Sequence, residues 1–219
     1  MQLVSVNVGR AQPIAAKSGM SGIFKLPDED TVWVSVDGLR GDVIVDTENH
    51  GGVDQAVYIY TAEDYAWWEA SLGRQLAPGI FGENLLIAGL ESAALSVGDR
   101  FRIGDVLLEV TSPRVPCVTL ATRMGDPQFV KKFMQAKRPG VYCRVLEAGV
   151  LRAGDAVVYT PYTGERVSAV EMMRFDLARR SSAEGLHRLL RAPVAIRARR
   201  YYEELLAVRE AVDFDPSTR

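Results

Sequence analysis

The sequence has little cysteine: Cys117 and Cys143 are its two cysteines among 219 residues. Two cysteines are too few for the disulfide framework of a small secreted scaffold. The chain also has no apolar run near the roughly 18 residues that a membrane span requires. Its first residues lack the basic stretch and apolar core of a signal peptide. We therefore expect a cytoplasmic protein with reduced thiols and no membrane partner.

Several catalytic and binding signatures are also missing. The sequence has no Walker P-loop, no G-x-G-x-x-G fingerprint and no G-x-S-x-G elbow. His50, His187 and the two cysteines are not at the short spacings of structural zinc ligands. A net charge of −2 gives the whole chain no basic footprint for nucleic acid. The composition is 47% hydrophobic and 25% charged, which is ordinary for a globular protein with a real core.

Up to about residue 160, short strands alternate with Gly, Pro and Asp turns. Val4, Val6 and Val8 alternate, so one strand should place all three on one face. A helix should begin after the capping residue Thr61 and end at Gly73. A second helix, 128–137, should follow the Asp-Pro pair at 126–127. The predicted strands are 3–8, 32–36, 56–60, 81–87, 99–103, 106–111, 141–146 and 155–159.

This pattern favours a β-rich α+β fold with a β-barrel-like core and a few flanking helices, because a doubly wound sheet would alternate strands with many more helices. After Pro161 the pattern becomes helical. Capping boxes at 168–171 and 181–184 and a helical spacing over 193–208 predict three helices. We therefore predict two domains, a barrel domain over residues 1–163 and a three-helix appendage over residues 164–212.

The helical region is rich in arginine. Nine arginines lie between Arg166 and Arg200, against three acidic residues in that span. Such a set can form a solvated helix face, or it can contact nucleic acid or an acidic partner.

Cys117 is the first candidate for chemistry. It follows Pro113, Arg114 and Pro116, and the two prolines stiffen the backbone and keep it out of a regular strand ladder. A nearby guanidinium favours the thiolate, which attacks electrophiles or binds soft metals. The alternative is a buried and inert thiol. On its predicted strand, Cys143 shares a face with Val141 and Val145. This pattern predicts that Cys143 is a core residue.

Three glycine-containing loops are further candidates. His50 precedes Gly51 and Gly52, and paired glycines can turn backbone N–H groups toward an anion; a surface loop explains them equally well. Asn84, in a Gly-Glu-Asn stretch, could bind the edge of a heterocycle or simply form a turn. Lys25 lies between two apolar residues, where it could bind phosphate or extend its charge to solvent.

Six motifs follow one another along the chain: Gly22…Lys25, Gly38-Leu39-Arg40-Gly41-Asp42, His50-Gly51-Gly52-Val53-Asp54-Gln55-Ala56, Phe81-Gly82-Glu83-Asn84-Leu85, Pro113-Arg114-Val115-Pro116-Cys117 and Gly140-Val141-Tyr142-Cys143-Arg144-Val145. Taken together and in this order, these motifs resemble the MOSC domain, the C-terminal domain of molybdenum cofactor sulfurases. The helices after residue 166 are similar to the three-helix module of its YiiM-like branch, so the resemblance covers nearly the whole chain.

The resemblance implies a molybdenum-pterin cofactor, and Cys117 matches the catalytic cysteine that ligates molybdenum. It further implies an oxidoreductase whose small-molecule substrate is an N-hydroxylated base or a related compound. The sequence has no flavin or iron–sulfur motif, so a reductase would need an external electron-donor protein. The residues that the resemblance places around the cofactor are Lys25, His50, Gly51, Gly52, Asn84 and Arg114.

Two other functions stay open on the sequence. Cys117 could carry a persulfide in a sulfur-carrier or sulfur-transfer protein, since that role also needs an exposed thiol of low pKa. The arginine-rich helices could instead belong to a non-catalytic binding module. The sequence leaves the oligomeric state and the physiological substrate undetermined.

Overall fold

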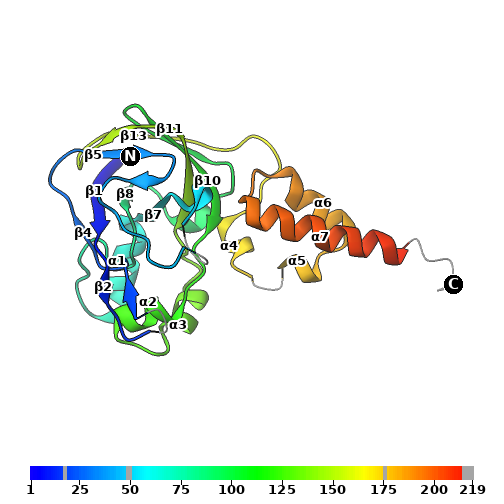
Figure 1. Cartoon of the computed structure of the whole chain (residues 1–219), viewed down its shortest axis with the longest axis horizontal. Coiled ribbons are helices and arrows are strands. Elements are labelled where there is room, and N and C mark those ends of the chain that lie inside the picture. The colour runs from blue at the N-terminus through cyan, green and yellow to red at the C-terminus, as the bar shows by residue number, and fades with distance from the viewer. Residues whose placement is uncertain (17–18, 48–50, 175–176, 214–219) are drawn as a thin grey trace.

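A computed structural model describes residues 1–16, 19–47, 51–174 and 177–213 of the chain. A β-rich body contains the N-terminal three-quarters of the chain, and the last helices project from one side of it (Figure 1). The fold is mixed α+β. No helix within these residues is long and apolar enough to cross a membrane.

The body is built on one eight-stranded sheet with the strand order β13-β9-β10-β11-β7-β8-β1-β4. Neighbouring strands are antiparallel except for β7 and β8, which are parallel. Parallel neighbours need a long crossover, and helix α1 lies in the connection between them. The strands are β1 (Gln2–Gly9), β4 (Lys25–Pro27), β7 (Val57–Thr61), β8 (Leu85–Ala88), β9 (Arg100–Ile103), β10 (Val106–Pro113), β11 (Val141–Glu147) and β13 (Val157–Thr160).

The described sheet does not close into the predicted barrel, and β13 and β4 are its edge strands. The start of β1 does meet the start of β13. Leu3 N–H donates to Asp155 O at 2.9 Å, and Val157 N–H donates to Met1 O at 3.1 Å. Farther along β1, Asn7–Gly9 pair with β4 instead. Hydrogen bonding between the first and last strands therefore stops after a few residues. The prediction of a β-rich α+β fold is confirmed, but the described core is an open mixed sheet and not a closed barrel.

The first strand also departs from the predicted alternation. Val6 is buried, whereas Val4 is 43% exposed. The pairing register with β8 shifts between Leu3 and Ser5. A bulge adds one residue to a strand and exchanges the faces of the side chains on either side of it, so Val4 and Val6 do not share a face.

Each face of the sheet contributes to a different apolar cluster. One cluster contains Val57, Ile59 and Cys143, and the other contains Tyr58 and Tyr60 from the intervening positions of β7. Helices cover the second face, so β7 is buried at every position on both of its sides. The covering helices are α1 (Ala62–Leu72), α2 (Val118–Met124) and α3 (Phe129–Ala136).

The ends of α1 are where the sequence predicts them. The hydroxyl of Thr61 accepts from Asp64 N–H at 3.3 Å, and Gly73 ends the helix with φ of 65°. That positive φ suits glycine, which has no Cβ to clash. The helix packs Trp68 against Phe129 and Phe133 of α3.

Smaller strands and short helices complete the body. One three-stranded sheet has the order β12-β5-β6, and β2 pairs with β3. These elements are β2 (Gln12–Pro13), β3 (Met20–Ser21), β5 (Val32–Ser35), β6 (Gly38–Leu39), β12 (Gly149–Leu151), η1 (Val53–Gln55) and η2 (Ser92–Ala94).

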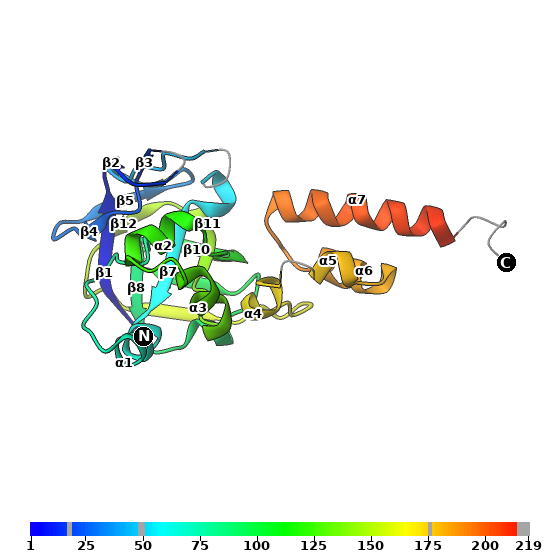
Figure 2. The same cartoon turned by 90° about the horizontal axis from the view of Figure 1, so that it is seen from below.

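The C-terminal region contains four helical segments among the described residues: α4 (Ala169–Met172), α5 (Leu177–Arg180), α6 (Ala183–Arg191) and α7 (Ile196–Asp213). Helix α4 is attached to the body, since Ala169 N–H donates to Leu95 O at 2.9 Å and Ala169 packs in the sheet cluster. Helix α7 runs beside α6 (Figure 2), where Leu186, Leu189 and Tyr202 form a separate core. The domain boundary near residue 164 stays a prediction.

Candidate functional site

A cavity opens on the helix-covered face of the sheet and contains most of the residues that the motifs indicated. Five of those residues line it: Lys25, Gly51, Asn84, Arg114 and Cys117. They come from β4, the 51–55 loop, the start of β8 and the segment after β10. The other lining residues are Met20, Ser21, Gly22, Ile23, Asp42, Val43, Ile44, Val45, Asp46, Gln55, Tyr58, Gly82, Thr119 and Tyr142.

Cys117 lies at the point where the chain leaves the sheet. Strand β10 ends at Pro113, a short irregular segment follows, and Cys117 is the N-cap residue of α2. Its side chain is partly exposed in the cavity. The strand extends through Pro113, which still pairs with Val141, and it ends before Pro116. The thiol therefore lies just beyond the end of β10, as expected for a segment that leaves the ladder at a proline. The sequence did not predict helix α2.

Arg114 is one of two buried cations among the described residues that line this cavity, together with Lys25. Its Nη1 donates to Phe81 O at 2.6 Å, and its guanidinium lies 5.0 Å from the ring centroid of Tyr58. Burial disfavours its charge, but Tyr142, Tyr58 and the thiol of Cys117 outweigh burial and raise the pKa of Arg114. Its Nε is buried without a hydrogen-bond partner in the described structure.

Lys25 and Asn84 both bind Asp42. The ammonium of Lys25 donates to both carboxylate oxygens of Asp42, and Asn84 Nδ2 donates to Oδ2 at 2.9 Å. Gly9 N–H donates to Oδ1 at 2.8 Å. Burial lowers the pKa of Lys25, and the Asp42 carboxylate opposes that shift. Asn84 Oδ1 also accepts from Tyr58 N–H at 3.0 Å, so this network fixes the cavity wall and leaves Lys25 with a neutralising partner.

The paired glycines line two neighbouring cavities. Gly51 lines both the Cys117 cavity and a second cavity beside α7, whereas Gly52 lines the second one. Both have positive φ, 81° and 79°, as expected for a loop that needs glycine. Gln55 Oε1 accepts from Gly51 N–H at 3.1 Å. His50, the remaining predicted residue, lies outside the described residues.

Sequence reasoning missed three residues of the site: Asp42, Tyr58 and Tyr142. Asp42 ends the Gly38–Asp42 motif, but the sequence analysis assigned it no function. Tyr58 was interpreted only as part of the strand 56–60. A signal for Tyr142 was present, because Cys143 faces the core and adjacent residues of a strand face opposite sides. A ring contact supports the assignment, since the centroids of Tyr58 and Tyr142 are 5.0 Å apart and their planes are tilted by 36°.

Glu83 lies behind the cavity wall and is fully buried. Its Oε1 accepts from Tyr65 O–H at 2.5 Å and from Gly79 N–H at 2.6 Å. Burial raises the pKa of Glu83 to about 7. The folded state therefore holds this proton more tightly than the unfolded state, and the resulting stabilisation is present below pH 4.5 and is lost as the pH rises through about 7.

We expect the free energy of unfolding to fall by roughly 3 kcal/mol from this group between pH 4.5 and 8. Glu83→Gln keeps a neutral amide in the same space, so its unfolding free energy should change much less over that range. Urea denaturation at a series of pH values measures both. Parallel pH profiles for the two proteins would contradict a raised pKa at Glu83.

Cys143 is confirmed as a core residue. It is fully buried in the sheet cluster, and burial raises its pKa. We therefore expect iodoacetamide to alkylate Cys117 in the native protein and both thiols after unfolding. Peptide mass spectrometry identifies the modified residue, with Cys117→Ala as the control that should take up no label while folded. Native labelling of Cys143 would show that the interpretation is wrong.

Comparison with known proteins identifies the family of this chain. Residues 46–158 match the MOSC domain, and the chain belongs to the MOSC domain family. The uncharacterized protein YflK of Bacillus subtilis (strain 168) is 40% identical over 154 residues, which cover 69% of this chain and 70% of that protein.

The structure is YiiM-like. The crystal structure of YiiM from Geobacillus stearothermophilus superposes with a TM-score of 0.75 and 28% identity, covering 94% of this chain and 98% of that one. A protein of Gibberella moniliformis (strain M3125 / FGSC 7600) named "Reductase" is 30% identical over 197 residues. These residues cover 88% of this chain but 35% of that longer protein.

Proposed function

We propose that this protein is a molybdenum-cofactor-dependent reductase of N-hydroxylated bases or related compounds, acting in the cytoplasm. Membership of the MOSC family, which is associated with the molybdenum cofactor, supports the proposal, as does the distant relative named reductase. The observation that carries it is the placement of Cys117 and Arg114 in one cavity.

The side chains in the cavity suit a molybdenum-pterin cofactor. A thiolate is a soft ligand that fits molybdenum, and Cys117 presents one sulfur to the cavity. The pterin carries a phosphate, and Arg114 supplies a buried guanidinium whose Nε has no described partner. Arginine binds phosphate well because its planar fork makes charge-assisted hydrogen bonds. When bound, the cofactor would supply the two-electron chemistry.

The chain's own residues would hold and shield the reaction. Cys117 would fix the metal, Arg114 would bind the phosphate, and the Asp42 network would keep the wall in place. Tyr58 and Tyr142 would cover the thiol side of the cavity with apolar surface. The overall reaction is R–NHOH + 2 e⁻ + 2 H⁺ → R–NH₂ + H₂O, with both electrons from an external electron-donor protein.

Metal analysis tests the proposal. Wild-type protein made in a host that synthesises the cofactor should contain close to one molybdenum per chain, and it should reduce an N-hydroxylated base with reduced viologen as electron donor. Cys117→Ala should lose both properties, whereas Cys143→Ala should keep them. Absence of molybdenum from the wild type, or equal molybdenum in Cys117→Ala, would refute the proposal. A persulfide on Cys117 by intact mass spectrometry, without molybdenum, would favour sulfur transfer instead.

A further inference from the structure

A second cavity adjoins the first and has no part in the function proposed above. It has a volume of about 430 Å³, which is within the range of small-molecule sites. One wall is the 51–55 loop and the other is the beginning of α7. Its described lining residues are Gly51, Gly52, Val53, Asp54, Gln55, Ala195, Ile196, Arg197, Arg200, Tyr201 and Glu204.

The two cavities share Gly51 and Gln55. The loop between them is held against α7 by Asp54. One carboxylate oxygen accepts from Ile196 N–H at 2.6 Å, and the other is 3.0 Å from Arg144 Nη2. This attachment fixes the second cavity beside the thiol cavity, so one extended ligand could occupy both.

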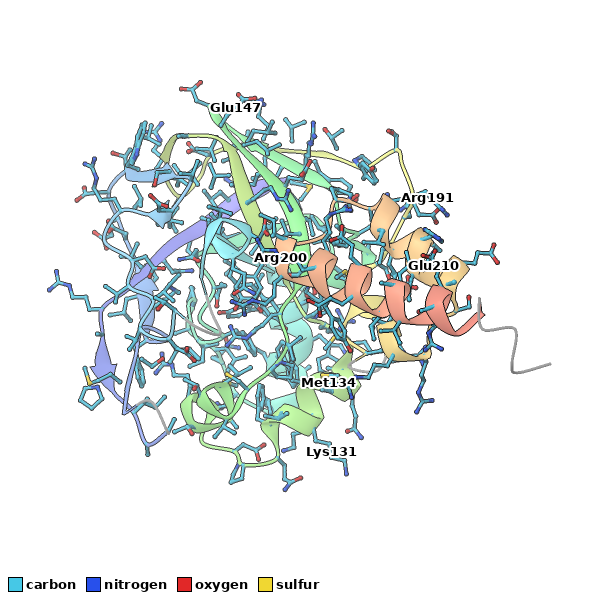
Figure 3. The ribbon with its side chains drawn as sticks, turned by 45° about the vertical axis from the view of Figure 1, so that its right-hand side comes forward. Lys131, Met134, Glu147, Arg191, Arg200 and Glu210 are labelled. Atoms are coloured by element: carbon cyan, nitrogen blue, oxygen red, sulfur yellow. The ribbon has the colours of Figure 1, made fainter. Side chains whose placement is uncertain are left out.

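The chemistry of the second cavity suits a sugar-phosphate. Arg200 is exposed on the first part of α7 beside the body (Figure 3), and it has no hydrogen bond or ion pair within the described part of the chain. The carboxylate of Asp54, in the same cavity, is bound by Ile196 and Arg144. Arginine is well suited to a phosphate group.

Other lining groups fit the rest of such a ligand. Val53 and Ile196 are about half exposed and offer an apolar surface. Tyr201 adds an aromatic ring, and its hydroxyl accepts from Arg179 Nε at 2.9 Å. Glu204 places a carboxylate in the same cavity, where it would repel phosphate but accept hydrogen bonds from sugar hydroxyls.

We propose that the second cavity binds the sugar-phosphate of a nucleotide whose N-hydroxylated base reaches Cys117. That the base is N-hydroxylated and reacts at Cys117 rests on the proposed function. That the sugar-phosphate binds here is argued only from the residues of the second cavity. The substrate class is then N-hydroxylated nucleotides in preference to free bases. The phosphate of the cofactor is the other possible source of an anion at Arg200, and the experiment separates the two.

Calorimetric titration with AMP and with adenosine tests the proposal, because AMP is the product of reducing N-hydroxylated AMP. Wild-type protein should bind AMP at least about tenfold more tightly than adenosine at low salt. Arg200→Glu should abolish this preference. Arg191→Glu makes the same charge change on α6, at a residue outside both described cavities that Figure 3 shows away from Arg200, and should retain it.

Molybdenum content is measured on the same variants. Unchanged molybdenum in Arg200→Glu, together with the lost AMP preference, supports a substrate site. Loss of molybdenum in that variant would assign the anion site to the cofactor and overturn the proposal. Failure of the wild type to prefer AMP, or to bind either compound, would also overturn it. If the wild type lacks molybdenum but shows the Arg200-dependent AMP preference, the nucleotide site stands and the reductase proposal alone fails.

Discussion

Replacement of Asp42 by alanine is expected to lower the free energy of unfolding by about 3–5 kcal/mol, because it leaves the buried ammonium of Lys25 unpaired. Lys25 is 6% exposed, and both oxygens of Asp42 accept its hydrogen bonds. The change also removes the acceptors of Asn84 Nδ2 and Gly9 N–H. Urea denaturation followed by circular dichroism measures the loss.

Two variants test whether this loss comes from the buried charge. Lys25→Met combined with Asp42→Leu removes both charges and should recover much of the stability, since an apolar pair can replace a buried ion pair. Glu147→Ala breaks the exposed pair with Arg102 and should change stability far less. Equal destabilisation by Asp42→Ala and Glu147→Ala would contradict the argument.

The loss at Asp42 should depend on pH. Burial lowers the pKa of Lys25 even with Asp42 present, and without the carboxylate the pKa should fall further. At Lys25 the folded state of Asp42→Ala then binds fewer protons than the unfolded state, so this group adds stability as the pH rises. Glu83 titrates in both proteins, so the test is the difference between them: the stability lost in Asp42→Ala relative to the wild type should shrink between pH 6 and pH 9.

If Arg114 binds the cofactor phosphate as proposed, its replacement by methionine should reduce the molybdenum content at least about tenfold, because the variant would lose that charge-assisted hydrogen bond. Arg114→Lys should give an intermediate loss, since it keeps the charge but not the planar fork. Arg123→Met is the matched control: Arg123 also has a buried Nε and contacts the ring of Phe24, but it does not line the cavity.

Arg114 also supports the fold through Phe81 O and Tyr58. Molybdenum is therefore compared among folded samples, with melting temperatures measured alongside. If Arg114→Met retains wild-type molybdenum while folded, Arg114 has a structural role and does not bind the cofactor.

Several arginines of the C-terminal helical region form ion pairs within the chain, which the amino-acid composition does not reveal. Arg188 pairs with Glu165 and Glu171, and Arg166 pairs with Asp99. These contacts join the helices to one another and to the body. Carboxylates of the chain thus neutralise part of the arginine charge. This weakens the hypothesis that these helices bind nucleic acid.

Local sequence motifs predicted that a helix exists more accurately than they predicted the residue at which it begins. The capping box at 181–184 predicted a helix, and α6 does begin there, but its capping residue is Ser182, whose Oγ accepts from Gly185 N–H. Ser181 Oγ instead donates to Leu177 O at 2.8 Å. Two adjacent serines offer the same chemistry, so packing decides between them.

The sequence by itself determined the local features of this protein: the caps of α1, the end of the strand before Cys117, the burial of Cys143, and the family. Each depends on residues that are close together in the chain or on their order. Only the tertiary structure decided that the sheet stays open, that Lys25 pairs with Asp42, and that α7 forms a second cavity at Gly51. Those features depend on strand register and on contacts between distant segments, which local propensity does not specify.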